Sequence, residues 1–350
     1  MRLETKIATL LMLAALALGS CTKKPHTPTE EPQPAEVGFT AASQAVWVKG
    51  ETDPKTTFPY TDFGVWGIAR NTSVASPYIL WTSNQLTEVS APEGTQTNKE
   101  ETNIVFTPTE AAYWLRDYSY DFLAIAPYNP SGLTNVAFTL KDAAGNTTGK
   151  DYMTFTYDMS SKYTSGDYAF DLLGAAAQYK VETGGYSTAQ NLMFWHLLSQ
   201  INISVSFGTG LGGEQIVGEV TAIRLGNVVS SGAFEVKHST GNEISTVCTP
   251  STDASAKKNL SFSGSSATFH IIPQNVKTMD LAIDFTINKG TASEATYTDF
   301  KINLNVPANE NDYTPNGKYN WIITIGVRNA ITFDIDVTPW TTGTGGTIEM

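Results

Sequence analysis

Few residues in this chain have types and spacing that could do chemistry. The 350 residues include two cysteines and four isolated histidines: His26, His196, His238 and His270. No HExxH, HxH or paired Cys/His spacing exists that would bind zinc. GNTTGKD (145–151) is not a phosphate-binding loop, because three residues rather than four separate its glycines and Asp151 replaces the required serine or threonine. We therefore predict no catalytic residue, metal ligand or cofactor, and a protein that is not an enzyme.

Asp334 and Asp336 are spaced so that catalysis by paired carboxylates has to be considered. They alternate with Phe333 and Ile335 in an amphipathic strand pattern, so both belong to one face. Two carboxylates can act as acid and base, but charges on the polar face of a strand more often meet water or protect a sheet edge. The pattern favours a solvated strand face.

Cys21 is the residue with the most specific chemical context. The segment from Leu16 reads LALGSCTKK, and it follows a basic head and an apolar run at 7–18. This pattern predicts a secretory signal peptide over residues 1–20, whose apolar run is too short to span a membrane. The order LGSC looks like the lipobox of bacterial lipoproteins, in which the cysteine is acylated and becomes the new N-terminus. We predict lipidation of Cys21; the alternative is an ordinary signal peptide with an incidental cysteine.

Residues 21–36 are a predicted tether. They contain four prolines and no large apolar residue, a composition that favours an extended spacer between a lipid surface and the first folded residue. Thr22 rather than aspartate follows the cysteine, which is typical of lipoproteins delivered to the outer membrane. We therefore expect the lipid on Cys21 to place the protein at the outer membrane.

Charge and cysteine count exclude further classes of protein. The net charge is −12 and no cluster of basic residues exists, so nucleic acid is not an expected partner. With Cys21 acylated, Cys248 is the only thiol left, and it cannot form an internal disulfide. Stability must then come from burial, for which the roughly 315 residues after the tether are ample.

Period-two alternation after the tether predicts an all-β fold. Expected strands in the first half are 37–48, 64–69, 78–82, 103–106, 120–126, 135–140 and 152–157. Those in the second half are 201–207, 219–228, 233–237, 267–272, 279–287, 300–306, 318–327 and 331–337. Two short helices are also predicted, over 109–116 and 170–179. Each half has the strand count of a β-sandwich, so we predict two tandem domains, 37–188 and 189–350, that meet at the polar stretch 182–190.

The order of several segments resembles the fimbrillin family, the lipoprotein pilins of type V pili in Gram-negative gut and oral anaerobes. After the lipobox and tether come DFGVWGIA (62–69), YDFLAIAPY (120–128), DLLGAAAQ (171–178), FWHLLSQINISV (194–205), FHIIPQ (269–274) and YNWIITIGVRNAITFDIDVTPW (319–340). Each motif is weak by itself. Their order and joint presence carry the resemblance, which covers nearly the whole chain.

The resemblance implies two transthyretin-like β-sandwiches and polymerisation with other pilin subunits by donor-strand exchange. In this family a trypsin-like protease removes the first strand after Arg or Lys, and the opened groove accepts a C-terminal strand from another subunit. VGFTAASQAVWV (37–48) matches the position of that first strand, so Lys49 is the expected processing site, with Lys55 and Arg70 as alternatives. Residues 331–350 contain either the donated strand or the last strand of their own sandwich. The lipid-anchored precursor would then enter an extracellular fimbrium, with adhesion as an accompanying role.

An anchor or accessory subunit that keeps its lipid is a second possibility within the family. Lys23 and Lys24 stand where an acid-rich stretch often directs these lipoproteins outward, and stalk subunits usually have a clearer basic cleavage site.

A surface glycan-binding lipoprotein is the alternative from a different class. Sandwich modules on a lipid tether can present aromatic rings to a polysaccharide. Trp47, Trp81 and Trp114 are nearest to polar loops and are the candidates for an exposed binding face. This hypothesis requires their rings to be accessible from solvent.

Overall fold

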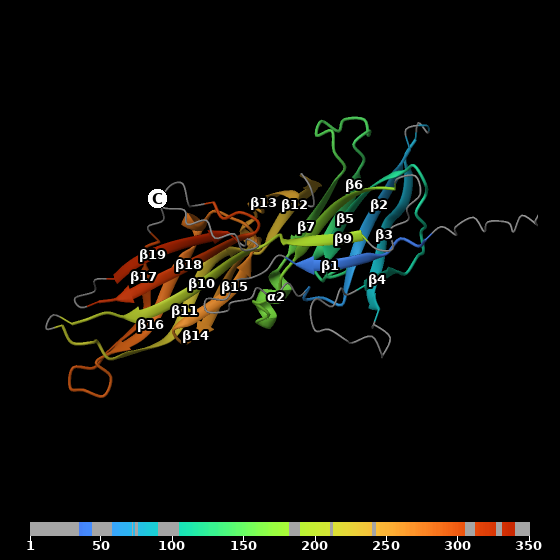
Figure 1. The fold of residues 1–350 in the computed structure, drawn as a ribbon. Coiled ribbons are helices and arrows are strands. Elements are labelled where there is room, and N and C mark those ends of the chain that lie inside the picture. Colours follow the sequence, from blue (N-terminus) through green and yellow to red (C-terminus); the bar gives the residue numbers. More distant parts are fainter. Residues whose placement is uncertain are drawn as a thin grey trace, which may run out of the picture. The chain divides into compact units, whose positions relative to one another are not determined.

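The computed structural model of this chain describes residues 35–43, 58–71, 73, 76–89, 105–181, 190–210, 213–239, 243–304, 312–326 and 331–339. These residues form mostly β-strands, which confirms the all-β prediction (Figure 1). Strands β1 to β19 are arranged as one closed barrel and three four-stranded sheets. Among the described residues, no helix has the length and apolar character needed to cross a membrane.

The barrel takes its strands from the first 196 residues. They are β1 (Phe39–Ser43), β2 (Asp62–Arg70), β3 (Tyr78–Val89), β4 (Val105–Pro108), β5 (Ser119–Ala126), β8 (Leu173–Lys180) and β9 (Gln190–His196). Their order around the barrel is β1-β4-β3-β2-β5-β8-β9, and the barrel closes because β9 pairs with β1. The interior is aromatic, and its fully buried rings include Phe39, Phe63, Phe106, Phe122 and Phe194.

Two of the four-stranded sheets share a core. One has the order β15-β10-β18-β19, with β10 (Ser199–Phe207), β15 (Ser266–Ile271), β18 (Gly317–Ile325) and β19 (Ile331–Pro339). The other has the order β14-β11-β16-β17, with β11 (Gly218–Val229), β14 (Lys257–Ser263), β16 (Asp280–Ile287) and β17 (Ala295–Ile302). Ile203 and Trp321 of the first sheet belong to the same apolar core as Ile223 and Ile283 of the second. This is the β-sandwich arrangement that the alternating pattern predicts.

The third sheet combines strands from the two halves of the chain. Its order is β13-β12-β7-β6, with β6 (Leu133–Thr139), β7 (Tyr152–Asp158), β12 (Ser231–His238) and β13 (Ile244–Pro250). Where β7 pairs with β12, the rings of Phe155 and Phe234 stack with centroids 5.2 Å apart. The division into 37–188 and 189–350 stays a prediction. Strand β9 follows that boundary and completes the barrel, and β12 extends a sheet that begins with β6 and β7.

The two predicted short helices are wrong. Residues 109–116 are irregular, and most of the expected helix over 170–179 is strand β8. Its alanines (175–177) favour a helix in isolation, but β8 pairs with β5 along its whole length and these alanines are buried. Long-range pairing and burial outweigh local propensity here. A short helix that was not predicted, α2 (Ser160–Ser165), is followed by Gly166, whose φ of 76° suits glycine.

Candidate functional site

Strand β1 closes the barrel between β4 and β9. It runs antiparallel to β4, where Phe39 lies opposite Phe106, and parallel to β9 from Phe39 to Ser43. Figure 1 shows β1, in blue, alongside β9, in yellow-green. Just before the strand, the backbone N–H of Val37 donates to the carbonyl of Ala112 at 2.8 Å. Without β1, the edges of β4 and β9 would have unpaired backbone groups.

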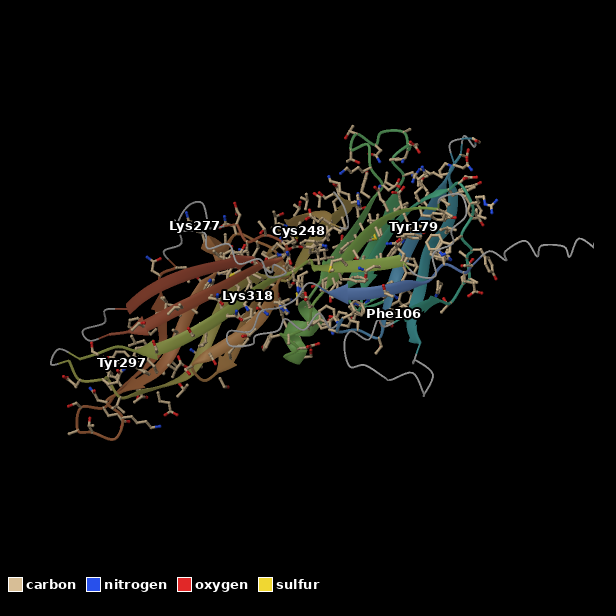
Figure 2. All side chains as sticks on the ribbon, in the orientation of Figure 1. Phe106, Tyr179, Cys248, Lys277, Tyr297 and Lys318 are labelled. Atoms are coloured by element: carbon tan, nitrogen blue, oxygen red, sulfur yellow. The ribbon has the colours of Figure 1, made fainter. Side chains whose placement is uncertain are left out.

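The side chain of Phe39 occupies a socket made of three aromatic rings. Its ring centroid lies 5.0 Å from that of Phe122, 6.3 Å from that of Phe63 and 6.3 Å from that of Trp81. We call these three rings the Phe39 socket. Phe39 is fully buried in it. Phe106 on the neighbouring strand β4, labelled in Figure 2, is also fully buried. The local alternation in VGFTA predicted a strand at this position, but it did not predict that Phe39 fills the barrel interior.

Three of the predicted site residues lie outside the described residues. Cys21, the predicted lipidation site, belongs to the undescribed residues 1–34. Lys49 and Lys55, two candidate processing sites, belong to the undescribed segment 44–57. In the sequence that segment connects β1 to the residues just before β2. A cut after either lysine would therefore separate β1 from the rest of the barrel and leave β2 attached to β3.

Arg70, the remaining candidate processing site, lies at the end of β2 inside a cluster of acidic side chains. Its guanidinium donates one hydrogen bond of 2.6 Å to Asp121 and two of 2.7 Å to Asp151. Its Nε lies 3.5 Å from a carboxylate oxygen of Asp142. The Arg70 side chain is only 12% exposed. Charge-assisted, bidentate contacts of this kind are among the stronger hydrogen bonds in proteins.

A cut after Arg70 would also remove β2 from the body of the protein. Seven of the nine residues of β2 are buried, and the strand pairs with β3 on one side and β5 on the other. Its loss would take Phe63 and Ile68 out of the core. The buried and paired surroundings of Arg70 therefore argue against it as a processing site.

We expect the folded chain to resist trypsin at Arg70. A protease needs an extended, unpaired backbone and a free side chain, whereas Arg70 is paired to Ser119 within the sheet and held by carboxylates. In limited digestion followed by mass spectrometry, a fragment that begins at Asn71 should be absent from the folded protein and should form once urea unfolds it. Exposed Arg116 is the internal control for protease activity. An early product starting at Asn71 under native conditions would contradict this protection.

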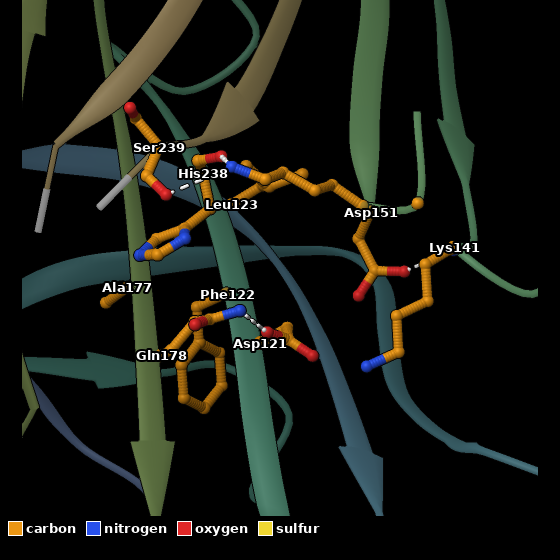
Figure 3. A pocket seen from close by; sticks show the side chains of 11 residues that line it. Asp121, Phe122, Leu123, Lys141, Asp151, Ala177, Gln178, His238 and Ser239 are labelled. Atoms are coloured by element: carbon orange, nitrogen blue, oxygen red, sulfur yellow. Dashed lines mark hydrogen bonds between the residues drawn. The ribbon is translucent and has the colours of Figure 1, made fainter. Parts of the chain in front are cut away.

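A pocket of about 250 Å³ opens beside the Arg70 cluster (Figure 3). Its walls include Asp121, Asp151, Lys150 and Gln178, and most of these groups bond to the protein itself. Gln178 donates to Asp121 at 2.6 Å, and Lys150 Nζ donates to two backbone carbonyls at 3.0 and 3.1 Å. Burial, together with the charge of Asp151, raises the pKa of Asp121 above its usual range. The Gln178 contact joins β8 to β5, and the Lys150 contacts join the turn before β7 to the end of β12.

Trp81 and Trp114, the two described candidates, do not form the exposed face that glycan binding requires. Trp81 is 3% exposed and its Nε1 donates to the carbonyl of Glu110, while Trp114 is fully buried. Both pack in the aromatic core of the barrel because a large ring buries well between strands. The expectation that these two rings are accessible is therefore corrected, and Trp47 lies outside the described residues.

Cys248 and His196 have surroundings that do not favour reaction. Burial raises the pKa of the Cys248 thiol to about 12, so this thiol on β13 stays protonated at neutral pH (Figure 2). His196 is buried at the end of β9, and its Nδ1 hydrogen-bonds to the carboxylate of Asp171. That contact joins the end of β9 to the residues just before β8.

The chain is similar to one protein family and to several solved structures. A family model described as fimbrillin-like matches residues 61–340. The crystal structure of a fimbrial protein from Bacteroides vulgatus has a TM-score of 0.50 and 15% identity, over 87% of this chain and 99% of that chain. A proposed cell adhesion protein from Bacteroides uniformis has a TM-score of 0.48 and 20% identity, over 87% of this chain and 98% of that chain. Another, from Bacteroides ovatus, has a TM-score of 0.49 and 14% identity, over 89% and 99%. A search among curated proteins finds no match.

Proposed function

Because this chain belongs to the fimbrillin-like family, we propose that it is a structural subunit of a cell-surface pilus that polymerises by donor-strand exchange. The observation that carries the proposal is the position of β1. This strand closes the barrel, yet a single cut in the segment after it would leave it held by non-covalent contacts alone. The fimbrial description of the Bacteroides vulgatus structure supports the same role.

Removal of β1 would create a groove that another strand can fill. The edges of β4 and β9 would lose backbone partners, and the core would lose Val37 and Phe39, which are at most 1% exposed. Full burial of an apolar side chain contributes about 1.5–3 kcal/mol. A strand with apolar side chains at the same positions would restore both the pairing and the burial, so a second subunit is a better occupant than water.

The same proposal gives the lipid a role in transport. Acylated Cys21 would hold the precursor at the outer membrane, with the Pro-rich tether keeping β1 away from the lipid surface. A trypsin-like protease that cuts after Lys49, or after Lys55, would then release the body from Cys21 and open the groove in one step. The released subunit would join an extracellular fimbrium.

Protease-triggered assembly tests this function. The chain from residue 22 to 350, treated with a trypsin-like protease, should lose a small N-terminal fragment and then form oligomers that resist heat and detergent. The matched control is a Lys49→Gln, Lys55→Gln double variant, which keeps β1 linked to β2 and should stay monomeric. Electrophoresis in detergent and N-terminal sequencing measure both steps. Wild-type chains that are cut between β1 and β2 and still remain monomers would contradict the proposal.

A further inference from the structure

We propose that β13 is a self-association edge: the β13 strands of two copies of this chain pair antiparallel about a two-fold axis and join their β13-β12-β7-β6 sheets into one continuous sheet. The inference goes beyond the pilus function proposed above. Strand exchange would occur at β1 in the barrel, whereas this contact uses a different sheet. In a pilus, where the contact repeats along each shaft, it would hold neighbouring shafts side by side.

Strand β13 lies at one end of its sheet and pairs with β12 alone (Figure 1). A backbone hydrogen bond just beyond each end of this pairing shows which residues are bonded to β12. The N–H of Ser251 donates to the carbonyl of Ser231 at 2.9 Å. The N–H of Ser239 donates to the carbonyl of Glu243, also at 2.9 Å. Because bonded and non-bonded pairs alternate along an antiparallel ladder, the odd-numbered residues of β13 are the ones bonded to β12.

The even-numbered residues of β13 therefore present their backbone groups at the open edge. The N–H groups of Ile244, Thr246 and Cys248 point away from β12, as do their carbonyls and the carbonyl of Pro250. None of these groups bonds to another backbone group among the residues that the structure describes. Pro250 has no N–H, so the row of donors ends at Cys248, which is labelled in Figure 2. Such a row is a template for a further strand.

Strand β13 lacks the protection that the other edge strands have. Its sequence, ISTVCTP, contains no charged residue, and its register with β12 is unbroken. By contrast, register shifts interrupt the pairing of β6 and of β17, and charged residues occur in β14, β17 and β19. On β15, the N–H of His270 donates to the carbonyl of Tyr168 at 2.9 Å, so that edge is partly covered. Proteins use such charges, irregularities and covers to prevent sheets from joining. Among the edges that the structure describes, β13 alone is regular, uncharged and open.

The same contrast identifies the partner, because a second β13 is the edge that matches best. A bulged or charged edge would leave hydrogen bonds unmade or place a charge at the contact. When two antiparallel β13 strands are aligned over their whole length, Thr246 exchanges both backbone hydrogen bonds with the partner's Cys248. The N–H of Ile244 donates to the carbonyl of the partner's Pro250. The same bonds recur on the other side of the two-fold axis, as a contact between identical surfaces requires.

Val247 would lie on the two-fold axis and contact its own copy. Its side chain is 54% exposed in the single chain and points to the opposite face from Cys248, which packs against the core. Non-bonded antiparallel pairs bring side chains closest together, so the two valines make an apolar contact. Ser245 would lie opposite the partner's Thr249, a pairing in which the hydroxyls can hydrogen-bond. No pair across the axis brings like charges together.

A charge at position 247 tests the contact in a chain that is not cut between β1 and β2. The parent is the Lys49→Gln, Lys55→Gln chain 22–350, and sedimentation velocity at rising concentration measures its association. We expect reversible dimers, which Val247→Lys should weaken about tenfold because it places two ammonium groups opposite each other. The matched control is Val217→Lys, which should associate as the parent does, since Val217 is 63% exposed and lies outside β13. An equal mixture of the Val247→Lys and Val247→Glu chains should recover dimers.

A cross-link tests the register. In the chain 22–350 the only native thiol is Cys248, and burial raises its pKa to about 12, so it should stay unreactive. Val247→Cys in the same parent should form a covalent dimer in a glutathione redox buffer, because a non-bonded antiparallel pair has a Cα separation that a disulfide can span. Thr249→Cys is the control and should form none, since it would face the partner's Ser245.

The inference is wrong if the parent stays monomeric up to its solubility limit, if Val247→Lys dimerises as well as the parent, or if Val247→Cys gives no covalent dimer. None of these results would affect strand exchange. A single β13 contact is small and should separate in detergent, so the electrophoretic assay for strand exchange does not detect it. The processed Val247→Lys chain should still form detergent-resistant oligomers, and a failure of strand exchange would leave the association through β13 intact.

Discussion

We expect Phe39→Ala to lower the free energy of unfolding of the uncut chain by about 3–5 kcal/mol. Phe39 is fully buried, and its ring contacts Phe63, Trp81 and Phe122, so truncation leaves a cavity between strands that are paired elsewhere. Urea unfolding followed by tryptophan fluorescence measures the effect, because Trp81 lies in the socket itself. The loss should be accompanied by faster proteolysis in the segment after β1, since a weakened β1 leaves the barrel more often.

Thr40→Ala is the matched control on the same strand. Thr40 points away from the core, and its truncation removes one hydrogen bond to Asn191, so the expected loss is about 1 kcal/mol or less. The difference in unfolding free energy between the two variants separates the contribution of the Phe39 socket from that of strand pairing. If Phe39→Ala is no more destabilising than Thr40→Ala, β1 does not close the barrel in solution, and the assembly mechanism loses its premise.

Arg70→Met should be comparably destabilising, by about 3–5 kcal/mol at neutral pH. The substitution keeps an unbranched side chain in place but removes the cation from between Asp121 and Asp151, whose side chains are 15% and 6% exposed. The buried carboxylates of Asp121 and Asp151 would then lie near each other without the guanidinium that pairs with both. The exposed Arg116→Met variant is the control, and its unfolding free energy should be within about 0.5 kcal/mol of that of the wild type.

The pH dependence of the unfolding free energy of the Arg70→Met variant identifies the cause of its destabilisation. Burial and the charge of Asp151 already raise the pKa of Asp121 in the folded protein, and loss of Arg70 raises it further. The folded variant therefore binds a proton that the unfolded chain releases, so its stability falls as pH rises through the folded pKa. The deficit relative to wild type should shrink as pH is lowered from about 7 toward about 5. A deficit that does not change with pH would mean that lost packing, rather than charge, is responsible.

Local patterns were sufficient for strands with a clear buried face. The predicted strands at 64–69 and 318–327 correspond to Asp62–Arg70 and Gly317–Ile325, because alternating or continuous apolar residues leave few other structures available. Strand Ile244–Pro250 was missed, since it is half-exposed and its alternation is weak. The segment 170–179 has a helical pattern yet contains most of strand Leu173–Lys180, because alanine-rich sequence has no preference for a strand until a partner strand is present.

The candidate site was predictable only in part for the same reason. The strand containing Phe39 followed from its alternation and its place after the tether, but the rings that hold Phe39 come from β2, β3 and β5. The sequence offers Arg70 only as an alternative processing site, because it is basic. Nothing near it in sequence indicated carboxylates 51 and 81 residues further along the chain. The roles of Cys21 and Lys49 stay predictions, since both lie outside the described residues.

The sequence by itself determined that this chain is built from strands and which side of a clearly alternating strand faces a core; the signal peptide and tether before them stay predictions. Those properties depend on side-chain period and composition, which are local. Only the tertiary structure decided that β1 lies beside β9, about 150 residues away, that β7 pairs with β12 across the middle of the chain, and that Arg70 is enclosed by acids. A strand's alternation fixes its two faces but not its neighbour, because partner and register are chosen by packing against residues distant in sequence.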